Sequence, residues 1–85
     1  MGMGEAIRFR LKKGRVSEDD VAFFSSAWDA LLKRVWEAKG LLDEMLAVAS
    51  RAGDSVAFNR VLKALFLAES LEYAVMSIPR HLRAR

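Results

Sequence analysis

Apolar residues recur at every third or fourth position over most of the chain, which is the period of a helix that packs along one side. The first series alternates steps of three and four without interruption, and it consists of Val21, Phe24, Trp28, Leu31, Val35, Ala38, Leu42, Met45, Ala49 and Ala52. The second series consists of Ala57, Val61, Ala64, Ala68, Leu71, Val75 and Ile78. This heptad spacing is typical of helices that lie side by side, so the pattern predicts two long helices with coiled-coil packing.

Capping residues stand at the ends of both series. Ser17 precedes three acidic residues, so a side-chain cap and negative charge meet the positive end of the first helix dipole. Gly53 is placed to end that helix, and Asp54 or Ser55 to begin the next one. Pro79 stops the second series. The sequence therefore predicts helices over residues 18–52 and 55–78.

Gly40 leaves an alternative open within the first helix. A glycine after Lys39 is typical of a helix C-cap, and a break there would give three helices. The heptad phase runs through Gly40 without a shift, however, and no capping residue restarts a helix at Leu41 or Leu42. A glycine inside a helix costs about 1 kcal/mol relative to alanine, which a long packed helix tolerates. We therefore expect an unbroken helix.

The expected fold is all-α, a long antiparallel helical hairpin that pairs with a second copy into a dimeric bundle. The chain has 85 residues, of which 53% are hydrophobic, and association would bury the apolar surface that so small a domain cannot cover. We expect the core of this homodimer to contain Phe24, Trp28, Leu31, Val35, Val61, Leu65, Ala68 and Leu71.

Charge divides the chain into a basic N-terminal arm (1–15), a helical hairpin (16–78) and a basic C-terminal tail (79–85). The arm and the tail together carry eight basic residues and one acidic residue, whereas the hairpin carries six basic and ten acidic residues. Because the turn lies near residue 53, both basic segments join the same end of the hairpin. The candidate nucleic-acid-binding residues are Arg8, Arg10, Lys12, Lys13, Arg15, Arg80, Arg83 and Arg85.

The arm alternates apolar and basic residues over 6–12, which predicts a short strand or extended arm. A strand must pair, and its own copy in a dimer would give a two-stranded ribbon with arginines facing outward. This ribbon followed by helices resembles the ribbon–helix–helix repressors, which implies strands that enter the DNA major groove. Two features depart from that family: the helix over 18–52 is far too long, and the expected short turn is missing.

Residues that could carry catalysis are few. The chain has no cysteine and one histidine, His81, which stands in the tail, so zinc and thiol chemistry are excluded and a bland surface role is expected for this ring. Glu69 and Glu72 share the spacing of a metal-binding helix, but no second acidic pair accompanies them. No phosphate-binding loop or nucleophile motif occurs. We expect a protein that is not an enzyme and holds no cofactor or metal.

The remaining features of the sequence concern the location and source of the protein. No apolar run reaches the roughly 18 residues of a membrane span, and the first residues lack a signal-peptide pattern, so we expect a cytoplasmic protein. The absence of Gln and the single Asn59 favour a thermophilic source.

Two functions fit these patterns. The first is an accessory or regulatory protein that binds DNA or RNA through its basic ends. The second is a protein–protein adaptor or assembly subunit whose helices dock a helical partner, without nucleic-acid binding.

Overall fold

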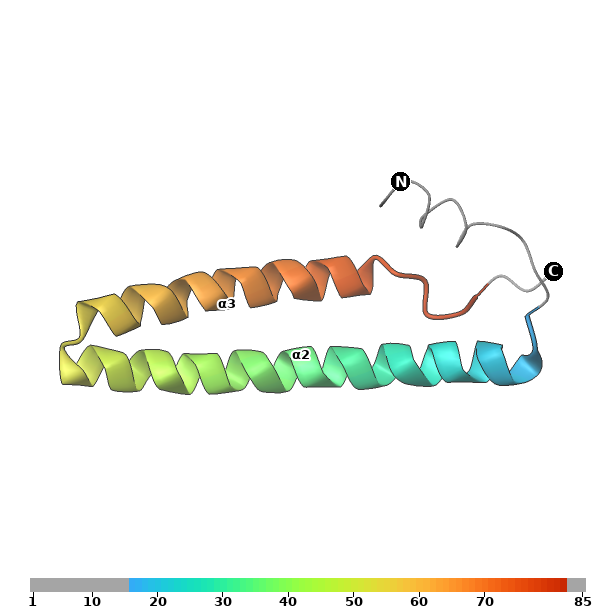
Figure 1. Cartoon of the computed structure of the whole chain (residues 1–85), viewed down its shortest axis with the longest axis horizontal. Helices are drawn as coiled ribbons and strands as arrows, with labels where there is room; N and C mark the ends of the chain where they lie inside the picture. The colour runs from blue at the N-terminus through green and yellow to red at the C-terminus, as the bar shows by residue number, and fades with distance from the viewer. Residues whose placement is uncertain (1–15, 83–85) are drawn as a thin grey trace, which may run out of the picture.

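The computed structural model describes residues 16–82, and within them the protein is a hairpin of two antiparallel helices (Figure 1). Helix α2 runs over Glu18–Ala52 and helix α3 over Ser55–Met76. The all-α helical hairpin is therefore confirmed. The predicted strand at 6–12, the rest of the arm (1–15) and residues 83–85 lie outside the described residues.

Helix α2 begins at the predicted cap. The Ser17 hydroxyl accepts a hydrogen bond from the Asp20 backbone N–H at 3.1 Å, and the Asp20 carboxylate accepts one from the Ser17 N–H at 3.3 Å. This reciprocal capping box satisfies two backbone donors that have no partner inside the helix. The start of α2 is thus specified by a local polar motif and needs no tertiary contact.

Gly40 lies inside α2, which continues unbroken on both sides. The prediction of a continuous helix is confirmed, and the three-helix alternative is wrong. With 35 residues, α2 is about 52 Å long at 1.5 Å per residue. A Cβ atom built on Gly40 would meet nothing within 4 Å, so no close contact requires a glycine at this position.

The hairpin turn depends on a left-handed glycine. Gly53 has φ +70°, a conformation that costs other residues free energy because of their Cβ atom. The N–H of Asp54 donates to the Ala49 carbonyl at 3.2 Å, which closes the end of α2. The Asp54 side chain then accepts from the Ala57 N–H at 3.0 Å, so Asp54 caps α3.

Helix α3 ends at Met76, two residues earlier than the sequence predicts. Beyond it the backbone makes a tighter turn, in which the Ile78 N–H donates to the Val75 carbonyl, three residues back, at 2.9 Å. Pro79 is the physical reason, since its ring disfavours the helical conformation for Ile78 and so ends the helix early.

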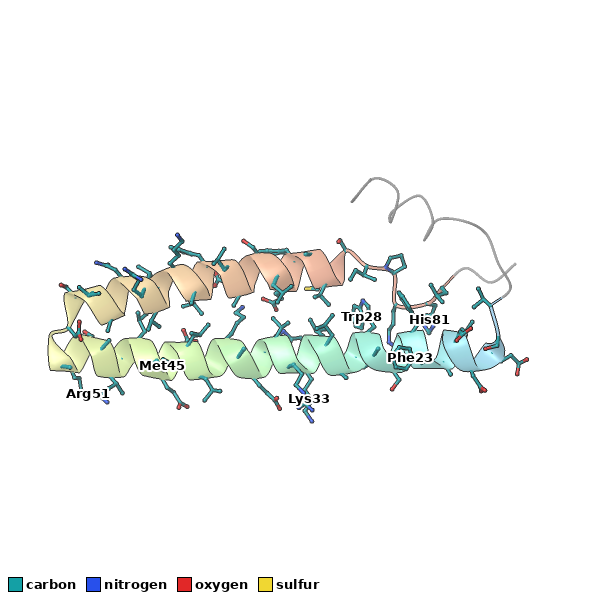
Figure 2. All side chains as sticks on the ribbon, viewed as in Figure 1. Phe23, Trp28, Lys33, Met45, Arg51 and His81 are labelled. Carbon is teal, nitrogen blue, oxygen red and sulfur yellow. The ribbon has the colours of Figure 1, made fainter. Side chains whose placement is uncertain are left out.

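The core lies between the two helices. The buried hydrophobic residues of the described range are Leu32, Val35, Ala49 and Val75, each less than a tenth exposed. Three of them, Leu32, Val35 and Val75, form one cluster with Trp28 packed against it. Figure 2 shows Trp28 between the helices and Lys33 on the side of α2 away from α3. Within one chain this core is small.

The seam of α2 differs from the predicted heptad at alternate positions. Leu32 is buried against α3, whereas Leu31 is 42% exposed in the single chain, so its place in the joint core of a dimer stays a prediction. The reason is that adjacent residues point about 100° apart, and α3 lies on the Leu32 side of the shared positions Trp28 and Val35. Leu71 of α3 is likewise 49% exposed. The other residues expected in the joint core are partly buried, and these are Phe24, Val61, Leu65 and Ala68.

Neither helix of the described range is long and apolar enough to cross a membrane.

Candidate functional site

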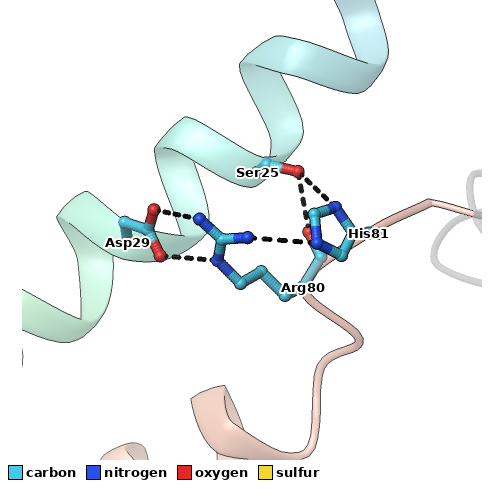
Figure 3. A network of polar contacts seen from close by, with 4 residues as sticks. All are labelled: Ser25, Asp29, Arg80 and His81. Atoms are coloured by element: carbon cyan, nitrogen blue, oxygen red, sulfur yellow. Dashed lines mark hydrogen bonds and ion pairs between the residues drawn. The ribbon is translucent and has the colours of Figure 1, made fainter.

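The segment after α3 packs against the first half of α2, where an arginine–carboxylate pair holds it (Figure 3). The Arg80 Nε atom donates to Asp29 Oδ1 at 2.8 Å, and Nη2 donates to Oδ2 at 2.6 Å. Two parallel bonds from a planar guanidinium fix both the position and the orientation of the segment. The C-terminal segment is therefore docked as far as the structure describes it.

Ser25 and His81 complete this polar network. The Ser25 hydroxyl donates to the Arg80 carbonyl at 3.1 Å and lies 3.0 Å from His81 Nδ1. The other ring nitrogen, Nε2, lies 3.0 Å from Arg80 Nη1. Because a guanidinium only donates, Nε2 accepts, and Nδ1 then carries the proton and donates to the serine.

This proton arrangement is the opposite of what a nucleophilic serine needs. A catalytic histidine accepts the serine proton, whereas here the Ser25 proton goes to a carbonyl and the ring donates to the hydroxyl. The network therefore holds the C-terminal segment against α2. His81, expected to be a bland surface residue, takes part in it.

The pairing with Asp29 affects Arg80 as a candidate nucleic-acid-binding residue. The hydrogen bond from Arg80 lowers the pKa of the Asp29 carboxyl, and the same bond raises the pKa of Arg80. The positive charge of Arg80 is thus compensated by a neighbouring carboxylate. The other predicted nucleic-acid-binding residues lie outside the described range, and these are Arg8, Arg10, Lys12, Lys13, Arg15, Arg83 and Arg85.

A second polar cluster joins the middle of α2 to α3. Glu72 accepts from the Trp36 indole N–H at 2.7 Å with one oxygen and from the Lys39 ammonium at 2.7 Å with the other. The hydrogen bond from Lys39, and to a smaller extent that from Trp36, lowers the pKa of Glu72. The hydrogen bond to Glu72 raises the pKa of Lys39. Both Glu72 oxygens are engaged, and no group of three potential metal ligands occurs among residues 16–82.

Both polar clusters lie on one side of the hairpin. Ser25, Asp29 and Trp36 are spaced by four and seven residues, which places them along one side of α2. We call this side the polar face, and it comprises Ser25, Asp29, Trp36, Lys39 and Glu72 with the docked Arg80 and His81. Trp36 is 54% exposed there, with its indole N–H satisfied by Glu72.

The opposite side of the hairpin is almost free of charge. Leu31 is five residues from Trp36 and therefore about 140° away around α2. A second series of residues at heptad spacing runs through Leu31. We call this side the uncovered face. On α2 it comprises Phe24, Ala27, Leu31, Arg34, Ala38, Leu41, Met45, Val48 and Ala52. On α3 it comprises Val56, Arg60, Ala64, Leu67, Leu71, Ala74 and Ile78.

Two hollows of unequal size mark the uncovered face. Near the turn, a groove of about 480 Å³ is lined mainly by apolar residues, with Glu44 and Asp54 also at its wall. Its apolar lining consists of Leu41, Met45, Val48, Ala49, Ala52, Ala57 and Val61. Near the other end, a hollow of about 130 Å³ is lined by Phe24, Ala27, Trp28, Leu31 and Ile78. The face is thus hollowed near the turn, where three alanines are in the groove wall, and it carries two aromatic residues at the other end.

The sequence pattern did not predict the partners of Arg80 and Glu72. One signal was present, since Asp29 is a carboxylate beside the apolar stripe and Arg80 follows the helix-ending proline. Periodicity carries no information about a non-helical segment, so the docking of that segment could not be read from the pattern.

No known protein family, curated protein or solved structure matches this chain. The evidence for its function therefore lies in the two faces of the hairpin.

Proposed function

We propose that the protein is a non-catalytic assembly subunit that associates with further copies of itself through the uncovered face. The observation that carries this proposal is the concentration of exposed apolar residues on that face. Fourteen large hydrophobic residues of the described range are exposed, against three buried ones, Leu32, Val35 and Val75. Eight of the fourteen belong to the uncovered face, and these are Leu31, Leu41, Met45, Val48, Val56, Leu67, Leu71 and Ile78.

Such a distribution supports association for a physical reason. Single exposed hydrophobic residues are ordinary on protein surfaces, but a contiguous apolar face with few charges is typical of an interface. The uncovered face carries two basic residues, Arg34 on α2 and Arg60 on α3, and two carboxylates, Glu44 and Asp54, at the wall of its groove. A second hairpin laid on this face would complete a four-helix bundle with heptad packing on both sides of α2.

The proposal is tested by the mass of the purified chain in solution, measured by light scattering at micromolar concentration. The wild-type chain should have the mass of a dimer or a larger assembly. Met45→Glu, on the uncovered face, should reduce that mass, because a carboxylate buried without a partner is strongly unfavourable. Circular dichroism shows whether the dissociated chain stays helical.

Phe66→Glu is the matched control. Phe66 is 60% exposed and Met45 52%, so neither side chain is needed inside one hairpin. Phe66 lies outside the uncovered face, and its replacement should leave the mass unchanged. A well-folded monomer from the wild-type chain would overturn the proposed function, and so would equal dissociation by both variants.

We propose nucleic-acid binding as a second candidate function, favoured by the position of the docked segment. Residues 16–82 carry seven basic and ten acidic side chains, so the basic excess of the chain belongs to residues 1–15 and 83–85. The contacts of Arg80 and His81 with α2 put residue 82 toward the same end of the hairpin as residue 16 (Figure 1). The two basic stretches therefore join the described hairpin at one end.

Gel shifts with duplex and single-stranded nucleic acid at two salt concentrations test this candidate. Binding should weaken steeply with salt, with a log–log slope of about −0.9 per phosphate contacted on duplex DNA. Replacing Arg8 and Arg10 by alanine should reduce sequence discrimination, whereas removing residues 80–85 should weaken binding to all sequences alike. No binding at low salt would leave assembly as the function.

A further inference from the structure

We infer that the second copy on the uncovered face runs antiparallel to the first, related to it by a two-fold axis that crosses α2 near Ala38. This inference rests on the proposed self-association and adds the orientation and register of the partner. In this register, residues of α2 whose numbers add up to 76 face each other across the axis. Phe24 thus faces the level of Ala52, and Leu31 faces the level of Met45.

Shape favours this orientation. The bulky end of the uncovered face carries Phe24 and Leu31, and the turn end carries the groove of about 480 Å³ with Ala49 and Ala52 in its wall. An antiparallel partner brings the bulky end of each copy to the groove of the other. A parallel partner would lay groove on groove and leave a void, which protein interiors avoid because unfilled space loses packing contacts.

Charge favours the same orientation. Arg34 is the basic residue of α2 on this face, and a parallel two-fold axis would place the two copies of Arg34 at the same level, where they repel. The antiparallel register separates them by about 12 Å along the axis. It also brings each Arg34 within about 3 Å, along the axis, of the level of Glu44 in the other copy. Glu44 lines the groove, so a carboxylate is available there.

Alanine at the axis allows a close approach. Ala38 is exposed in the single hairpin, and at the two-fold axis it would face its own copy. A small side chain at the crossing point lets two helices pack at the short end of the usual 8–10 Å range. The arrangement differs from the two-stranded ribbon expected at residues 6–12, which would need the N-terminal ends of both copies together.

Disulfide cross-linking of the full chain tests the orientation, because the chain has no cysteine of its own. A mixture of Leu31→Cys chains and Met45→Cys chains should form a cross-linked dimer after oxidation. Either variant alone should not, because its two cysteines would lie about 21 Å apart along the axis, far beyond the roughly 7 Å between Cα atoms that a disulfide spans. Phe66→Cys, off the face, is the control for random collisions and should remain uncross-linked.

Ala38→Cys tests the position of the axis separately from the orientation of the partner. The two copies of this cysteine should cross-link to each other, because both lie at the axis. If the wild-type chain assembles but Leu31→Cys links to itself more readily than to Met45→Cys, the antiparallel orientation is overturned and the assembly function stands. If the wild-type chain assembles but Ala38→Cys does not cross-link, the position of the axis is overturned. If the chain is a folded monomer, the function and this inference both fall.

Discussion

Trp28 joins the two helices at the end away from the turn. Its indole N–H donates to the Val75 carbonyl at 3.2 Å and to the Ile78 carbonyl at 2.8 Å. The last carbonyls of a helix have no i+4 donor within it. The indole gives the Val75 carbonyl a second donor beside the Ile78 N–H, and it donates to the Ile78 carbonyl just beyond the end of α3. The tryptophan expected to be a core residue therefore also acts as a C-terminal cap for the neighbouring helix.

Replacing Trp28 by phenylalanine should lower the free energy of unfolding by about 1 kcal/mol. An aromatic ring remains, but the Ile78 carbonyl loses the indole donor, whereas the Val75 carbonyl keeps the Ile78 N–H. Chemical denaturation at a fixed protein concentration measures the change. Trp36→Phe is the control, since Trp36 is 54% exposed and its partner Glu72 keeps Lys39. A loss as large from Trp36→Phe would contradict a special role for Trp28.

The Asp29–Arg80 pair predicts a dependence of stability on pH. The pKa of Asp29 is lowered in the folded chain from its ordinary value of 3.8. The pair therefore stabilises the fold above that value, and the contribution is lost as pH falls through the lower folded pKa. Between about pH 5 and pH 2 the melting temperature should fall less steeply for Asp29→Asn than for the wild-type chain. Equal slopes would mean that the docking of the C-terminal segment does not affect stability.

At the scale of the elements, the two described glycines predict opposite effects of the same substitution. Gly40→Ala should stabilise the protein by up to about 1 kcal/mol, because the helix is continuous and a methyl group meets nothing within 4 Å. Gly53→Ala should destabilise it by about 1 kcal/mol or more, because φ is +70° there. Thermal or chemical denaturation of both variants at one concentration checks the signs. A loss of stability in Gly40→Ala would contradict an unbroken α2.

The start of α2, the continuity through Gly40 and the turn at Gly53 were all predictable, because each depends on residues close together in sequence. The phase of the core along α2 was not. The series through Leu31 and the series through Leu32 share Trp28 and Val35, and both are apolar enough to form a seam. Only the side on which α3 lies decides between them, and that is a property of the tertiary structure.

At the scale of the whole molecule, the proposed association should contribute to stability, because the core of one hairpin is small. A chain that assembles gains stability with concentration, because mass action favours the folded assembly over unfolded monomers. The melting temperature of the wild-type chain should therefore rise as the protein concentration is increased tenfold, and scanning calorimetry can measure the shift. In Met45→Glu the shift should be smaller or absent. A melting temperature independent of concentration in the wild-type chain would contradict an association coupled to folding.

The single turn of the hairpin has a consequence for valence. Because α2 is about 52 Å long and the chain returns along it, the described range begins and ends near one tip of a rod. In the proposed antiparallel pair, the two Glu18 residues lie about 60 Å apart, at opposite tips. Whatever the chain ends bind, the pair is then a divalent linker with a fixed spacing, so that it bridges two separate ligands and does not clamp one from both sides.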